Sequence, residues 1–363
     1  MIENKDSYYN LEQMLKLQEN GVIIPDLSSV RIGHEVPLEK ITAGSKLYPF
    51  VRINGSKTEI HSGSSIGLCG PTFLDNSWIG ENAVVGNLGG VTLKDTVVGP
   101  GTILGSGVAE DSVLLGKESN VNDFTTGYGF RIRKGTLYEE DASSAQHTDT
   151  KMTILFPWVT LGSNINFCDL ILAGGTGPEP SFFSEAGSGS VHFNYSIRGD
   201  KATSSIFGDV KNGVFLDQKR IFIGGNSSLI GPIKAEYGAM NAAGVRINGN
   251  FISGLNFGHS LPKGKIDYNP SIFLGVMNIL RKQVNVIAEL TALLNWYQQI
   301  RISCFAQTQN QKFLYDSAVR IIELNFEERL SHLQRFVNAI EASHNLALKN
   351  EKISNKEIEE QKL

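Results

Sequence analysis

The chain has 363 residues, of which 41% are hydrophobic and 19% are charged. Its 33 basic and 37 acidic residues leave a formal net charge of −4, so no basic excess neutralises nucleic-acid phosphates. The cysteines, Cys69, Cys168 and Cys304, form no CxxC pair, which disfavours a disulfide scaffold and a zinc finger. The N-terminus lacks a signal-peptide layout, and no apolar run approaches about 20 residues. Composition predicts a cytoplasmic protein with no membrane span and no nucleic-acid partner.

Glycine and proline divide the chain near residue 270. All 11 prolines and 37 of the 38 glycines lie at or before Pro270, and only Gly275 follows. Both residues mark turns and are costly inside helices. We therefore expect a turn-rich domain over 22–268 and a helical domain over 269–348.

Two short segments flank these domains. A helix over Leu11–Leu17 is expected in the N-terminal lead-in, residues 1–21. Charged residues make up 8 of the 15 residues of 349–363. Such a composition buries too little apolar surface to fold, so we expect this tail to be disordered.

The glycine-rich domain contains a six-residue repeat, in which an aliphatic residue is often followed by glycine. A period of six fits neither an α-helix nor an ordinary β-strand. It is typical of a solenoid whose aliphatic residues point inward from short parallel strands. The predicted inward positions are Ile79, Val85, Val98, Leu104, Leu115, Ile223 and Leu229.

Beyond residue 269, apolar residues recur every three or four positions, as on one face of an α-helix. One set is Leu280, Val284, Ile287, Leu290, Leu294 and Tyr297; the other is Val319, Ile322, Phe326, Leu330, Leu333, Val337 and Ile340. The polar segment Gln307–Asn310 is expected to turn the chain. These stripes predict an α-helical hairpin that packs on itself or on another copy and carries no chemistry.

Three segments carry a family resemblance within the span 20–255. They are RIRKGTLYEEDA (131–142), the residues of 187–209 around His-Phe-Asn-Tyr, and GGNSSLIGPIKAEYGAMNAAG (224–244). They resemble the acetyltransferase domain of the bifunctional UDP-N-acetylglucosamine pyrophosphorylase / glucosamine-1-phosphate N-acetyltransferase family. The resemblance implies a mainly β fold, a left-handed parallel β-helix, assembled as a homotrimer with active sites between subunits.

The chain departs from that family at both ends. The family's N-terminal nucleotidyltransferase domain has no counterpart in this sequence, and the helical hairpin has no counterpart in the family. We therefore expect no pyrophosphorylase activity from this chain. The acetyltransferase part implies acetyl-CoA, or another acyl-CoA, as co-substrate.

The resemblance places substrate-binding residues on consecutive coils. Arg133 and Lys151 match the family's two phosphate-holding positions, and Asn166 stands where the family has a tyrosine. Cations hold phosphate through charge-assisted hydrogen bonds. Arg133 and Lys151 are 18 residues apart, one coil, so stacking is expected to bring them to one edge. The alternative is a pair of solvated surface charges.

The coenzyme side is marked by a second set of residues. Asn194 and Tyr195 match the family's Asn-Tyr at the acetyl-CoA pocket, Lys201 follows at a similar distance, and Ala243 matches a position beside the pantetheine arm. For the Ala-Ala-Gly of 242–244, the alternative is simple packing of small residues at a corner.

The catalytic base departs from the family. N-acetyl transfer needs a group that takes the amine proton, usually a histidine, and Ser163 stands at the family's histidine position. His147, with Asp149 as a possible orienting carboxylate, and His192, two residues before Asn194, are the candidate replacements. For each, the alternative is a hydrogen-bonded histidine without a catalytic role.

Two classes of function therefore stay open. The first is an acyl-CoA-dependent acyltransferase acting on an amino sugar phosphate or UDP-sugar. The second is a non-catalytic trimer that binds a sugar nucleotide or scaffolds a separate nucleotidyltransferase. No cluster has metal-ligand spacing, so no metal is predicted.

Overall fold

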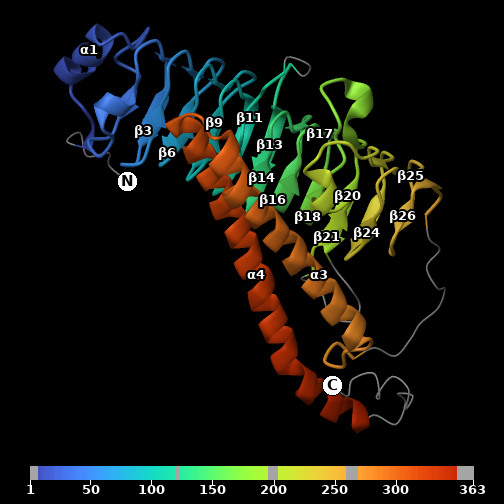
Figure 1. Ribbon diagram of the computed structural model, residues 1–363. Helices are drawn as coiled ribbons and strands as arrows, with labels where there is room; N and C mark the ends of the chain where they lie inside the picture. Colours follow the sequence, from blue (N-terminus) through green and yellow to red (C-terminus); the bar gives the residue numbers. More distant parts are fainter. Residues whose placement is uncertain (1–6, 120–122, 195–202, 259–268, 350–363) are drawn as a thin grey trace.

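The computed structural model describes residues 7–119, 123–194, 203–258 and 269–349. Its strands form parallel coils, about 11 in number, and a helical hairpin follows them (Figure 1). This arrangement confirms the predicted fold class, a mainly β parallel β-helix followed by an α-helical hairpin. No helix of the described part is long and apolar enough to cross a membrane.

The strands are short because each coil must turn a corner after two to eight residues. Their bounds are β1 Arg31–Ile32, β2 Lys46–Leu47, β3 Val51–Asn54, β4 Glu59–Ile60, β5 Ser65–Ile66, β6 Thr72–Asp75, β7 Trp78–Ile79, β8 Val84–Val85, β9 Val91–Lys94, β10 Val97–Val98, β11 Ile103–Glu110, β12 Ser112–Leu114, β13 Thr126–Ile132, β14 Thr136–Tyr138, β15 Ser143–Ser144, β16 Asp149–Leu155, β17 Val159–Leu161, β18 Asn166–Leu172, β19 Ser184–Ala186, β20 Val191–Asn194, β21 Ser205–Phe207, β22 Phe222–Ile223, β23 Ser228–Gly231, β24 Lys234–Ala235, β25 Ala239–Asn241, β26 Arg246–Ile247 and β27 Gly254–Asn256.

Among the described residues, one helix precedes the coils, three short helices interrupt them, and the hairpin follows them. Their bounds are α1 Leu11–Glu19, η2 Leu38–Lys40, η3 Pro180–Phe182, α2 Val210–Gly213, α3 Val276–Asn295, the π-helical η4 Trp296–Phe305 and α4 Gln309–Leu348. Helix α1 is the predicted N-terminal helix, and Asn10 caps it by accepting a hydrogen bond from the Gln13 backbone N–H. The predicted tail lies outside the described residues from 350 onward.

Stacked coils align equivalent side chains into inward ladders that fill the interior. All seven predicted inward residues are buried, and six of them lie on strands as expected. Leu115 follows β12 by one residue, and Leu114 takes the ladder position opposite Val98. The six-residue period therefore predicted the interior correctly, with one register slip at this coil.

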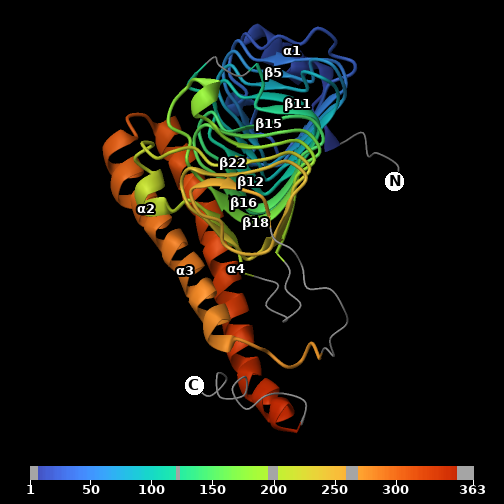
Figure 2. The ribbon, with the colours of Figure 1, turned by 90° about the vertical axis from the view of Figure 1, so that its right-hand side faces the viewer.

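The hairpin crosses the outside of the β-helix obliquely, and its far end projects beyond the coils (Figures 1 and 2). The chain turns between η4 and Thr308, which caps α4, close to the predicted turn. Of the stripe predicted over α3 and η4, Leu290 and Tyr297 are buried as expected, but Gln283 is buried in place of Val284, which is 53% exposed. On α4, Asn325 and Arg329 are buried and Leu330 is exposed.

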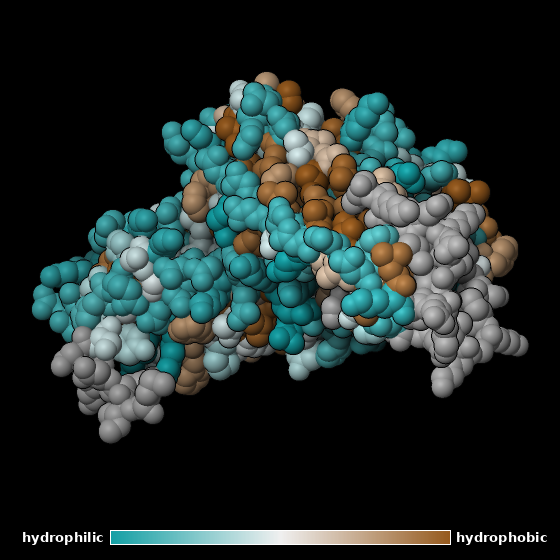
Figure 3. Space-filling model, turned by 90° about the horizontal axis from the view of Figure 1, so that it is seen from below, coloured by the Kyte–Doolittle hydropathy of each residue, from teal (hydrophilic) through white to brown (hydrophobic). Residues whose placement is uncertain are grey.

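The hairpin faces the coils with polar side chains as well as apolar ones, and this explains the displaced stripes. Asn325 donates a hydrogen bond to the backbone carbonyl of Gly135, and Arg329 pairs with Asp169. Apolar residues are consequently left outside. Seen from below, hydrophobic side chains gather in a patch bordered by hydrophilic ones (Figure 3).

Candidate active site

Arg133 and Lys151 lie on neighbouring coils of one face, as their spacing predicts. Arg131 of β13 pairs in register with Asp149 of β16, and the Arg133 backbone N–H donates to the Thr150 carbonyl. Thr150 belongs to an inward ladder and is fully buried, so Asp149 and Lys151 on either side of it face outward. The next coil continues this face with Asn166 opposite Asp149 and Cys168 opposite Lys151.

The charges on this face are partly paired with each other. The Arg133 guanidinium donates from Nε to Asp149 Oδ1 at 2.6 Å and from Nη2 to Cys168 Sγ at 3.3 Å. Burial raises the pKa of the Cys168 thiol, and the Arg133 charge opposes that rise. Asn166 Oδ1 lies 3.7 Å from Cys168 Sγ, and Lys151 is exposed. The face therefore presents Lys151 as an exposed cation, Arg133 as a cation already paired with Asp149, and one amide.

Helix α4 adds charged groups beside this face that the sequence analysis missed. Arg329 donates to Asp169 Oδ1 at 2.9 Å, and His332 pairs with Glu328 at 3.0 Å between Nε2 and Oε1. Burial raises the pKa of Asp169, while the positive charges of Arg329 and Lys151 act against the rise. The i, i+4 spacing of Glu328 and His332 was the only sequence signal for this pair.

His192 is sealed inside the β-helix. It lies in an inward ladder between Phe167 and Leu229, and it is 0% exposed. Its Nε2 lies 2.7 Å from Ser205 Oγ. Burial lowers the pKa of His192 to about 4. In this position the imidazole faces the interior and not the outer face that carries Arg133 and Lys151, so His192 cannot reach a substrate bound there.

His147 is exposed at a corner, two residues before Asp149. Its backbone has a φ of 56°, and its ring meets the Tyr128 ring edge-on at a centroid distance of 5.5 Å. The Asp149 carboxylate, expected as its orienting partner, is held by Arg133 instead. Ser163 lies at the corresponding corner of the next coil, where its backbone N–H donates to Ser188 Oγ at 3.1 Å.

The coenzyme residues are described only in part. Asn194 ends β20 and pairs in register with Gly231, while Tyr195 and Lys201 lie outside the described residues. Ala243 is exposed at a corner, and a Cβ on Gly224 would come within 2.6 Å of its backbone nitrogen. Close stacking of the corners thus accounts for glycine at position 224, whereas a Cβ at Gly244 would meet nothing within 4 Å.

Two curated relatives match the chain. It is 26% identical over 255 residues to the bifunctional protein GlmU of Thermosipho melanesiensis, covering 69% of this chain and 45% of the relative. The chain is similar to bifunctional protein GlmU. The GlmU of Thermotoga maritima is 23% identical over 234 residues, covering 64% of this chain and 41% of the relative. These matches confirm the resemblance found in the sequence.

The remaining comparisons concern the length of the match, family models and solved structures. The chain spans less than half the length of the GlmU proteins it matches. No family model matches it. An Arabidopsis UDP-N-acetylglucosamine acyltransferase structure covers 85% of this chain and 93% of its own, at 12% identity and a TM-score of 0.18, and this likeness is too slight to carry weight.

Proposed function

We propose that this protein is an acyl-CoA-dependent acyltransferase acting on an amino sugar phosphate or a UDP-sugar. The observation that carries the proposal is the placement of Arg133 and Lys151 on neighbouring coils, outward on one face, at the positions of the family's phosphate-holding pair. The similarity to GlmU supports the same class of reaction.

In the proposed reaction, Arg133 and Lys151 hold the substrate phosphate, and Asn166 donates or accepts a hydrogen bond beside them. The amine nitrogen of the sugar attacks the thioester carbonyl of the acyl-CoA. A C–N bond forms, the C–S bond breaks, and coenzyme A leaves as the thiol. His147 takes the proton that the amine loses and passes it to the departing thiolate, because it is the candidate histidine that solvent reaches.

The coenzyme is assigned by resemblance to Asn194, Tyr195, Lys201 and Ala243. We further propose a homotrimer in which neighbouring copies complete each site. The exposed apolar side chains of the hairpin, Val284, Leu330 and Val337, offer surface for contact between copies. Sedimentation equilibrium of the full chain measures this, and a monomer at all concentrations would contradict it. The three cysteines are unpaired, which supports the cytoplasm as compartment.

A non-catalytic protein that binds a sugar nucleotide, or scaffolds a separate nucleotidyltransferase, is the second candidate. Two observations favour it: Ser163 stands at the family's histidine position, and His192 is enclosed in the coil. Both candidates predict binding of a sugar phosphate at Arg133 and Lys151. They differ in whether an acyl-CoA binds and is consumed.

The deciding experiment combines a thermal shift with a thiol-release assay. Acetyl-CoA, UDP-N-acetylglucosamine and glucosamine 1-phosphate are screened at 100 times Kd, where binding stabilises by about 2.7 kcal/mol. His147→Ala should lower turnover by about 10²–10⁴-fold with little change in binding. His34→Ala, an exposed histidine of an N-terminal coil, is the matched control. Binding of UDP-N-acetylglucosamine without any response to acyl-CoA would establish the second candidate.

A further inference from the structure

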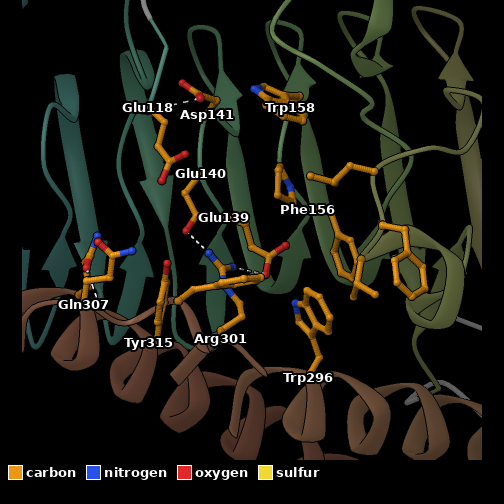
Figure 4. Close-up of a pocket in the computed structure, with 16 residues that line it drawn as sticks. Glu118, Glu139, Glu140, Asp141, Phe156, Trp158, Trp296, Arg301, Gln307 and Tyr315 are labelled. Carbon is orange, nitrogen blue, oxygen red and sulfur yellow. Dashed lines mark hydrogen bonds and ion pairs between the residues drawn. The ribbon is translucent and has the colours of Figure 1, made fainter. Parts of the chain in front are cut away.

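A cavity of about 550 Å³ lies where the hairpin turn meets the β-helix (Figure 4). The coils contribute the corners around Glu140 and Trp158, the segment 214–216 forms a side wall, and the hairpin contributes Trp296 and Arg301. Of the proposed acyltransferase residues that the structure describes, none lines it. Since the hairpin has no counterpart in the family, the cavity is specific to this architecture.

The walls of this cavity are largely aromatic. Trp296 lies with its ring centroid 6.3 Å from that of Phe215 and 6.4 Å from that of Phe305. Phe215 is 67% exposed, which is unusual for so large an apolar side chain. The Trp158 indole Nε1–H is shielded from solvent and has no acceptor within the described part of the chain. Such walls suit the apolar body of a small molecule and offer it one donor.

The charge of the cavity is strongly negative. Four carboxylates, those of Glu118, Glu139, Glu140 and Asp141, line it beside one guanidinium, that of Arg301. The Arg301 guanidinium forms ion pairs with both Glu139 and Glu140. Asp141 accepts from the backbone N–H groups of Glu118 and of the next residue.

Glu118 is the exposed carboxylate of this group. No donor in the described ranges is bonded to its side chain. Burial and the negative charge of Glu140 raise the pKa of Glu118, the positive charge of Arg301 lowers it, and the charge of Asp141 adds a smaller rise. A cation placed beside Glu118 would relieve this repulsion.

We propose that the cavity binds an organic ammonium ion with a flat apolar body and a hydrogen-bond acceptor. The ammonium group would pair with Glu118 and lie near the aromatic faces, which attract cations. The acceptor would take the Trp158 N–H. A bare metal ion fits less well, because the described residues contain no group of three His, Cys, Asp or Glu side chains arranged to hold one.

Three matched probes test the proposal by isothermal titration calorimetry on the full chain. Tyramine carries the ammonium, the ring and a hydroxyl; phenethylamine lacks the hydroxyl; 4-hydroxyphenylacetate replaces the ammonium by a carboxylate. We expect tyramine to bind most tightly, phenethylamine more weakly, and the anion not at all. Failure of both amines to bind at millimolar concentration, or equal binding of the anion, would overturn the proposal.

Variants locate the site. Glu118→Gln should weaken tyramine binding at least tenfold, and Trp158→Phe should abolish the difference between tyramine and phenethylamine. Glu81→Gln, an exposed carboxylate on another coil, is the matched control and should leave binding unchanged. Lys151→Ala should also leave it unchanged, so the outcome is independent of the proposed acyltransferase site. Tyramine binding that ignores Glu118→Gln would contradict the assignment.

Discussion

The β-helix and the seam between it and the hairpin are stabilised in different ways. Inside the coils, aliphatic side chains such as Ile53 and Ile66 are fully buried in register with their equivalents above and below. In the seam, Glu139, Arg301 and Arg329 are at most 9% exposed. Apolar burial is non-directional, whereas charge pairs need a defined geometry. The coils therefore stabilise the fold, and the seam fixes where the hairpin lies.

One buried group from each region shows the difference, because His192 and Glu139 respond to pH in opposite directions. Burial lowers the pKa of His192 from 6.5 to about 4, so the unfolded chain binds more protons between these values. Burial raises the pKa of Glu139 from 4.5 to about 7 against the pull of Arg301, so there the folded chain binds more. By linkage, His192 lowers the free energy of unfolding as pH falls through this range. Glu139 lowers the free energy of unfolding as pH rises.

The largest expected effect comes from the seam. Arg301→Leu removes the cation that faces Glu139 and Glu140, and it should lower the free energy of unfolding by about 3–5 kcal/mol at pH 8. Guanidinium chloride unfolding measures the loss, and hydrogen exchange should localise it to α3 and α4. The control is Arg320→Leu, which breaks a more exposed pair with Asp111 and should cost less than about 1 kcal/mol. Equal losses would show that the seam is not fixed by its buried charges.

The next effect is the acid sensitivity of the coils. Between pH 6.5 and 4, protonation of His192 in the unfolded chain should lower the free energy of unfolding by roughly 3 kcal/mol. His192→Leu removes the titrating group and should flatten this part of the pH profile. His34→Leu, at an exposed position, should leave the slope as it is. Because Glu139 gives the opposite slope over much of this window, the test is the difference between wild type and His192→Leu; a difference that does not change with pH would place His192 in contact with water.

The seam should show the opposite slope. Because the pKa of Glu139 is raised to about 7, the free energy of unfolding should fall by up to roughly 3 kcal/mol as pH rises from 4.5 to 7. Glu139→Gln keeps an acceptor for Tyr297 and Arg301 and should remove this slope. Unfolding curves at constant ionic strength measure it. A slope that survives in Glu139→Gln would have to come from another carboxylate.

The sequence predicted the coils better than the seam, and the reason is physical. A six-residue period follows directly from coil geometry, so Ile79 and Leu229 could be placed without knowing their neighbours. Which residues of α3 are buried depends instead on the surface of the coils against which the helix packs. Gln283 is buried where Val284 was expected, although its Oε1 has no hydrogen-bond donor within the described part of the chain.

The same distinction applies to the candidate site. The spacing of Arg133 and Lys151 equals one coil, and this sufficed to place them together. His192 stands between Val191 and Phe193, whose apolar character favoured burial of the neighbours and exposure of the histidine. The coil register does the reverse, with Phe193 50% exposed. The charged groups of α4 beside Lys151 come from 160 or more residues away, and no local pattern brings them there.

A smaller effect tests the proposed substrate site on the outside of the coils. Lys151→Ala should weaken UDP-N-acetylglucosamine binding by about 10–100-fold, the worth of one charge-assisted hydrogen bond. Calorimetric titration measures it. Lys94→Ala removes an exposed lysine from the outer face of an earlier coil and should change affinity by less than about twofold. Equal losses of affinity in the two variants would show that the ligand is attracted by the positive charge of the surface in general and not by Lys151 in particular.

The smallest expected effect on stability compares the buried face of α3 with its exposed face. Val286 is 1% exposed and Val284 is 53% exposed, so the same substitution meets two environments on one helix. Alanine favours a helix over valine by about 0.5 kcal/mol, while each buried methylene is worth about 0.8 kcal/mol. Val286→Ala should therefore destabilise by about 1 kcal/mol, and Val284→Ala should stabilise by up to about 0.5 kcal/mol. Changes of opposite sign in the unfolding temperature of the two variants, measured at low protein concentration, would support Val286 as buried against the coils and Val284 as exposed. A loss at Val284 that grows with concentration would instead place that residue between copies of the chain.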